Sequence, residues 1–105
     1  MASEAEWAQG FEWDTEKELK NIRERGLDFA TASLIWRGAV VESRDNRRDY
    51  GEVRIRAYGK VEGRLLAVVF TWRSVRRRII SARKANRREQ RLFETEIRRR
   101  ESERD

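Results

Sequence analysis

The apolar run Leu65–Phe70 restricts the fold of this chain more than any other feature of its sequence. The run does not alternate between apolar and polar residues, and it is far shorter than the ~18 residues of a membrane span. We therefore expect a central β-strand that is covered on both faces. Because charged residues make up 42% of the chain, few apolar residues remain to cover this strand, and we expect a thin core.

The segments around this run predict further strands. Glu52–Tyr58 alternates between polar and apolar residues, which predicts a half-exposed antiparallel strand. Gly59 and Gly63 bracket the turn that is expected after it. The sequence predicts further strands at Phe11–Trp13, Ala39–Ser43 and Arg76–Ala82.

Capping residues and apolar spacing predict three helices. Asp14 is a good N-cap for a helix that ends at about Arg25, with Gly26 at its C′ position. The other two helices are expected at Phe29–Trp36 and at about Lys84–Arg99.

These elements predict an α+β fold. We expect an antiparallel sheet of three to four strands, with two N-terminal helices and a C-terminal helix packed on one sheet face. The expected organisation is a single domain over residues 10–100, with residues 1–9 and 101–105 as tails.

The composition excludes several kinds of site. Without Cys or His there is no disulfide, no thiolate nucleophile, no imidazole acid–base pair and no His- or Cys-ligated metal. The carboxylates show no metal-ligand spacing and there is no Gly-rich phosphate loop, so we expect no metal and no other cofactor. Met1–Gly10 is acidic and is not expected to be a signal peptide. We expect a cytoplasmic protein that does not enter a membrane.

Charge is distributed unevenly along the chain. Residues 1–52 carry a net charge of −4 and residues 53–105 a net charge of +10. A basic stretch from Arg73 to Arg91 spans a strand and the start of a helix, and it would follow a phosphate backbone. The alternative interpretations are a solvated ionic surface, and a surface that binds an acidic protein.

The polar side of the predicted Glu52–Tyr58 strand is the first candidate for chemistry. Strand alternation places Glu52, Arg54, Arg56 and Tyr58 on one face, and Arg73 with Arg77 or Arg83 would lie beside them if the strands pair in sequence order. Guanidinium groups around a carboxylate suit a phosphodiester, and the carboxylate would accept a proton from a ribose 2′-hydroxyl. The alternative is an ordinary solvated face with cross-strand ion pairs.

Two further side chains are notable. Trp72 precedes Arg73 at a strand end and is the best of the four tryptophans for stacking on a base. Glu89 lies near the apolar stripe of the last helix, where a carboxylate needs a partner, and a sheet arginine would serve. The residues we expect to contact RNA are Arg56, Trp72, Arg77, Lys84 and Arg87.

Three segments of the chain resemble the BrnT toxins in order and spacing. They are Phe11–Asp14 with Gly26–Phe29, then Gly51–Arg54 with Gly63–Thr71 and Arg73, and finally Arg78–Glu89. The resemblance covers roughly residues 11–96.

The resemblance implies a RelE-like fold and an endoribonuclease toxin of a type II toxin–antitoxin system, which inhibits translation by cutting RNA. It also implies a partner, a BrnA-like ribbon-helix-helix antitoxin that forms a 2:2 complex with the toxin. In this complex only the antitoxin would contact operator DNA. The positions that match the family pattern as catalytic residues are Glu52, Arg54, Arg73 and Arg83.

The sequence departs from the family pattern at three positions. Arg25 replaces a family His, Phe93 replaces a Tyr, and Trp72 replaces a Glu. The mechanism compatible with these residues is metal-independent transesterification, with Tyr58, Lys60 or water as the general acid. Two other hypotheses are a weak or inactive toxin-like module that binds RNA or antitoxin, and a regulator that acts on DNA only through its partner.

Overall fold

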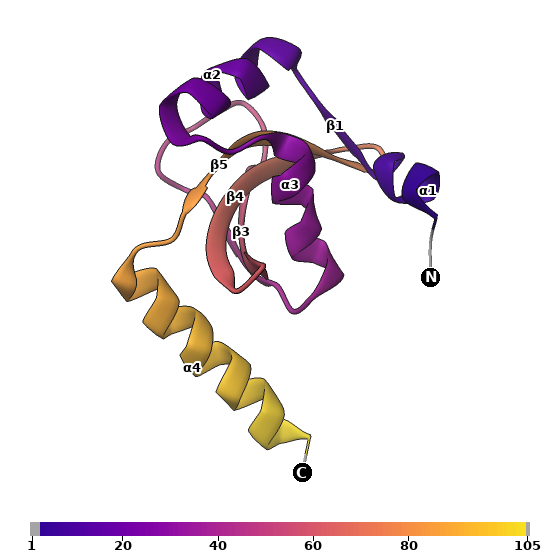
Figure 1. Cartoon of the computed structure of the whole chain (residues 1–105). Helices are drawn as coiled ribbons and strands as arrows, with labels where there is room; N and C mark the ends of the chain where they lie inside the picture. The colour runs from indigo at the N-terminus through magenta and orange to yellow at the C-terminus, as the bar shows by residue number, and fades with distance from the viewer. Residues whose placement is uncertain (1–2, 105) are drawn as a thin grey trace.

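A five-stranded mixed sheet forms the centre of the molecule in a computed structural model that describes residues 3–104 (Figure 1). The central strand, β4, is flanked by β5 and β3, and the short strands β1 and β2 form the edges. β1 runs parallel to β5, and all other neighbours are antiparallel. In the order in which they lie in the sheet, the strands are β1 (Phe11–Trp13), β5 (Arg76–Lys84), β4 (Arg64–Arg73), β3 (Ile55–Val61) and β2 (Val41–Arg44).

Local capping signals determine where the first helices begin and end. The Asp14 carboxylate accepts hydrogen bonds from two backbone N–H groups of the first turn of α2, and Gly26 ends that helix with a φ of 71°. Asp28 caps α3 in the same way. The helices are α1 (Glu4–Ala8), α2 (Thr15–Arg25), α3 (Phe29–Ser33), the 3₁₀ helix η1 (Leu34–Arg37) and α4 (Arg87–Glu103).

The main core lies between one face of the sheet and the α3–η1 segment. Phe29 and Ile35 from this segment are fully buried against Val68 and Phe70 of β4, in one cluster of apolar side chains. We call this the helix face of the sheet. Because β4 is buried along nearly its whole length, the expectation of a central strand covered on both faces is confirmed.

On the opposite face of the sheet, α4 packs at one end. Phe93 forms a cluster with Leu65 and Ala85, and Val41, Tyr58 and Ile97 pack against this cluster. Figure 1 shows that the rest of α4 extends away from the sheet. We call this side the open face, and it displays polar side chains of β3 and β5.

The α+β class is confirmed, but the details of the sheet and helices differ from the prediction. The sheet has five strands and is mixed, because Phe11–Trp13 joins the edge of β5 in parallel, a pairing between segments more than 60 residues apart that local sequence does not encode. The helices also do not share one face, since α4 packs on the open face. Residues 4–8, within the stretch predicted to be a tail, form α1, and α4 extends into the predicted C-terminal tail.

The turn predicted between Gly59 and Gly63 lies at the end of that range. β3 continues through Gly59 to Val61, and the two-residue turn is Glu62–Gly63, whose φ values of 50° and 78° are those of a tight hairpin. Gly59 is buried in the strand because η1 crosses it closely. A Cβ at this position would lie 2.7 Å from the Cβ of Ile35.

Candidate active site

The open face of the sheet places polar side chains in rows across the strands. Tyr58 on β3 and Arg83 on β5 are both register partners of Ala67 on β4. In the next row, Arg56 and Ser81 lie on either side of Val69 in the same way. Side chains in register on one face of a sheet are neighbours, so these rows bring Arg56, Tyr58 and Arg83 together.

Four arginines surround a small hollow over these rows. It has a volume of about 90 Å³, and its floor is formed by Ala67 and Val69. The guanidinium-bearing side chains come from four different segments: α2, the β2–β3 loop, β3 and β5. We call this hollow the arginine pocket, and its four arginines are Arg25, Arg47, Arg56 and Arg83.

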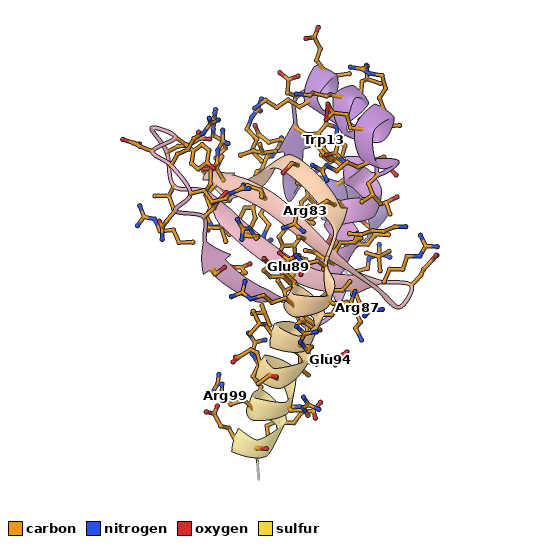
Figure 2. All side chains as sticks on the ribbon, turned by 90° about the vertical axis from the view of Figure 1, so that its left-hand side faces the viewer. Trp13, Arg83, Arg87, Glu89, Glu94 and Arg99 are labelled. Atoms are coloured by element: carbon orange, nitrogen blue, oxygen red, sulfur yellow. The ribbon has the colours of Figure 1, made fainter. Side chains whose placement is uncertain are left out.

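Glu89 of α4 holds Arg83 at the edge of the pocket. Two guanidinium nitrogens of Arg83 donate to the two carboxylate oxygens of Glu89 at 2.7 and 2.8 Å, and the Tyr58 hydroxyl donates to the same carboxylate at 2.8 Å. The hydrogen bonds from Arg83 lower the pKa of Glu89 to about 2. Figure 2 shows Glu89 directly beside Arg83 where α4 begins. The expectation that a sheet arginine partners Glu89 is confirmed.

The Tyr58 hydroxyl is protonated at neutral pH. Burial is the main cause that raises its pKa above the ordinary value of 10, and the bond to Glu89 acts in the same direction. Arg56 also donates to this hydroxyl, at 3.4 Å. The Tyr58 hydroxyl therefore carries its proton at neutral pH and lies beside Arg56 and Arg83 of the pocket.

A buried carboxylate in the β2–β3 loop fixes two more arginines of the pocket. The side chain of Asp45 is fully buried, and it accepts two hydrogen bonds from the Arg47 guanidinium, at 2.9 and 2.8 Å, and one from Arg56, at 3.4 Å. These contacts, Arg47 first, lower the pKa of Asp45 to about 2. The loop thus holds Arg47 over the sheet and leaves no unpaired carboxylate beside it.

Three of the four residues predicted to be catalytic form a separate cluster. Glu52 accepts from Arg54 at 3.2 Å and lies 3.9 Å from Arg73. Glu52 and Arg54 lie in the coil before β3, rather than on the strand, and the Arg54 guanidinium lies 4.1 Å from the ring centre of Tyr50.

The fourth predicted catalytic residue, Arg83, lies away from this cluster. Arg83 shares a row with Tyr58, which is four residues beyond Arg54 along the chain. At about 3.3 Å per residue this is ~13 Å along the sheet, so the two groups lie on different parts of the molecule's surface.

The residues predicted to contact RNA are divided between the two faces. Arg56 lies on the open face, while Lys84 and Arg87 lie at its end, where β5 stops and α4 begins. Trp72 and Arg77 lie on the helix face, where the Arg77 guanidinium is 4.6 Å from the Trp72 ring and 4.7 Å from the Trp36 ring. The structure brings Trp72 and Arg77 together but separates them from Arg83.

Three residues that shape the pocket are not among the predicted site residues. Asp45 and Arg47 lie in the loop after β2, and Arg25 was named only as a departure from the family pattern. One signal was present in the sequence. Acidic residues and arginines are interspersed in this loop, which favours ion pairs between their side chains over separate exposure of each charge to water.

The described part of the chain offers no metal centre and no membrane-spanning helix. Within residues 3–104, no three acidic side chains gather in a way that would hold a metal ion. None of the helices over the same residues is long and apolar enough to cross a membrane. What the open face offers instead is a dense group of fixed positive charges, which suits a phosphodiester anion.

Comparison with known proteins agrees with this chemistry. Residues 13–89 match the family model described as the ribonuclease toxin BrnT of type II toxin–antitoxin systems. No curated protein matches the chain. The matched range includes α2, the whole loop that carries Asp45, all of the larger strands and Glu89, so it spans every element that builds the arginine pocket.

Proposed function

This chain belongs to the BrnT family of ribonuclease toxins of type II toxin–antitoxin systems, and from that premise we propose that it cleaves RNA at the arginine pocket without a metal ion. The observation that supports this site is the convergence of Arg25, Arg47, Arg56 and Arg83 on one hollow of the open face. Four cations, three of which are held in place by Glu89 or Asp45, match the charge that grows on a phosphodiester during cleavage.

The proposed reaction is a transesterification within the RNA. The 2′-hydroxyl gives its proton to water as its oxygen attacks the neighbouring phosphorus, the bond to the 5′-oxygen breaks, and the leaving 5′-oxygen takes up a proton. A 2′,3′-cyclic phosphate and a 5′-hydroxyl are produced. Arg83 and Arg56 would stabilise the phosphorane through the N–H groups that their contacts with Glu89, Tyr58 and Asp45 leave over, because a guanidinium has five donors and stays charged throughout. Each such preorganised donor typically contributes ~10²–10³-fold to the rate.

Tyr58 is the proposed proton donor to the leaving 5′-oxygen. Its hydroxyl is protonated at neutral pH and lies beside Arg56, at the edge of the pocket. A proton lost to the leaving group would be replaced from water, while Glu89 stays ionised because its pKa is about 2. Glu89 therefore positions Arg83 and Tyr58 and does not transfer a proton itself.

The Glu52–Arg54–Arg73 cluster supports a second arrangement. There a partly exposed carboxylate lies next to two guanidiniums, so a base for the 2′-hydroxyl and groups for the phosphate are in one place. If the scissile phosphate binds at this cluster, Glu52→Gln abolishes cleavage and Arg25→Gln does not. If the scissile phosphate binds in the arginine pocket, Arg25→Gln slows cleavage. Glu52→Gln then removes only the carboxylate that holds Arg54 and Arg73 in place, and cleavage continues.

The proposed partner is a BrnA-like ribbon-helix-helix antitoxin in a 2:2 complex, through which the toxin would reach operator DNA. The family's membership in type II systems supports an antitoxin, and the exposed cations of the open face suit an acidic segment lying across it. The proposal also includes RNA contacts by Arg56, Lys84 and Arg87 on this face. Trp72 and Arg77 would contact only a strand that passes around the β4–β5 end of the sheet.

Regulated expression of the free protein in bacteria tests the proposal. We expect growth arrest and RNA fragments with cyclic-phosphate and 5′-hydroxyl ends, and relief of both by a co-expressed antitoxin. Arg23→Gln is the matched control for Arg25→Gln, because Arg23 is an exposed arginine on the same helix that does not line the pocket. Normal growth with abundant folded protein would instead favour a binding module, and Arg25→His would then test whether the family residue restores cleavage.

A further inference from the structure

A second, larger hollow lies at the end of the open face, next to α4. It has a volume of about 410 Å³ and is bounded by the β3–β4 turn, the end of β5 and the first turns of α4. Leu65 and Phe93 contribute to its wall as buried side chains. Three cations surround it: Lys60, Arg64 and Lys84.

The cations of this hollow are available for a ligand. Lys60, Arg64 and Lys84 are exposed, and none of them forms an ion pair within 4.0 Å among the ion pairs identified in residues 3–104. Glu94 is the acid that lines the hollow, so the charge around it is about +2. Figure 2 shows Glu94 on the side of α4 where Arg87 also lies, below Arg83.

The hollow lies beyond the arginine pocket along the sheet, and the network of Arg83, Glu89 and Tyr58 lies between the two. Arg83 and Lys84 are adjacent, and the Arg83 guanidinium donates to the Lys84 carbonyl oxygen at 3.2 Å. On β3, Lys60 lies two residues beyond Tyr58 and on the same face. Two residues of a strand span ~6.6 Å, which is about the separation of neighbouring phosphates in an extended single strand.

We propose that Lys60, Arg64 and Lys84 form a second phosphate subsite, which binds the RNA phosphate next to the one held in the arginine pocket. This inference rests on the proposed ribonuclease function. It also defines the path of the bound strand across the protein, which would lead from Arg83 toward the β3–β4 turn. The wide opening of the hollow suits an unpaired strand, and its three cations bind the backbone without selecting a base.

The contribution of this subsite can be measured without cleavage by binding a single-stranded RNA that the protein cannot cut. A fluorescent 2′-O-methyl RNA of six nucleotides is titrated with protein at several salt concentrations. The triple variant K60Q/R64Q/K84Q should bind about tenfold more weakly, as expected when a charge-assisted hydrogen bond is removed. The slope of log affinity against log salt should also fall by about 0.7 for each phosphate that the variant no longer neutralises.

A matched variant controls for net charge. K17Q/K20Q/R23Q removes three exposed cations of α2, away from the hollow, and should bind the strand within about twofold of the unchanged protein. Glu94→Gln removes the acid of the hollow and should tighten binding. The subsite is overturned if the two triple variants bind equally, or if Glu94→Gln binds no more tightly than the unchanged protein.

Cleavage assays on the same proteins separate this inference from the proposed function. Cleavage by the unchanged protein together with equal affinities of the two triple variants would remove the subsite and leave the ribonuclease proposal intact. Selectively weaker binding by K60Q/R64Q/K84Q without any cleavage by the unchanged protein would support the subsite and contradict the ribonuclease proposal. A protein that binds no single strand would overturn both.

Discussion

Replacing Glu89 with Gln should destabilise the fold by an amount that depends on pH. Glu89 is 10% exposed and accepts two hydrogen bonds from Arg83, one from Tyr58 and one from the Asn86 backbone at the start of α4. Glutamine keeps the shape of the side chain, but it removes the charge and turns one acceptor into a donor that faces Arg83. The substitution therefore isolates the ionic part of the network.

The pKa of Glu89 gives the magnitude. It is lowered from the ordinary value of 4.5 to about 2, and a shift of about 2.5 units corresponds to about 3 kcal/mol of stability at pH 7. Because the folded-state pKa is depressed, this contribution is complete above the unfolded pKa and is lost as the pH falls toward 2. By pH 3 about half of it should remain.

Urea denaturation at pH 7 and at pH 3 measures this difference. At pH 7, Glu89→Gln should lower the free energy of unfolding by about 3 kcal/mol, and the melting temperature should fall by on the order of 10 °C or more. At pH 3 the gap between the two proteins should be about half as large. Glu94→Gln is the control, since it makes the same chemical change further along α4 on an exposed side chain. A gap below about 0.5 kcal/mol at pH 7, or one that does not change with pH, would refute the reasoning.

Three further substitutions test how the sheet and its loops are held together. Asp45→Asn should destabilise the protein by about 2–4 kcal/mol in urea denaturation at pH 7, because it leaves the Arg47 and Arg56 guanidiniums without their anion; an effect within experimental error would contradict the role of this carboxylate. Asn21→Ala should cost about 2–4 kcal/mol by the same assay, since the Asn21 amide bonds both the N–H and the carbonyl of Ala82, and a change below about 1 kcal/mol would show that water replaces it. Gly59→Ala should leave little folded protein by circular dichroism, because the added Cβ would lie 2.7 Å from the Cβ of Ile35; a melting temperature equal to that of the unchanged protein would mean that η1 shifts freely.

The features that sequence predicted best are those with local causes. The cap at Asp14 and the left-handed Gly26 are confirmed, because each depends on a hydrogen bond or backbone conformation within a few residues. The pairing of Glu89 with a sheet arginine is confirmed as well, since a carboxylate near an apolar stripe requires a cation within reach.

The features that sequence did not predict depend on distant contacts. The parallel addition of β1 to β5 joins segments separated by most of the chain. Gly59 was placed in a turn because glycine favours turns, whereas it is buried in β3 to let Ile35 approach. For the candidate site, alternation correctly placed Arg56 and Tyr58 on one face, but it extended the strand to Glu52, which lies in the coil before β3.

Cleavage of a defined single-stranded RNA by the purified protein in the presence of EDTA tests the central claim most directly. The account predicts fragments with 2′,3′-cyclic-phosphate and 5′-hydroxyl ends. It also predicts a rate ~10²–10³-fold lower for Arg83→Lys, which keeps a charge for Glu89 but loses the planar fork, and an unchanged rate for Arg23→Gln. No cleavage by the unchanged protein, or equal rates for all three proteins, would contradict the assignment of the arginine pocket as a ribonuclease site.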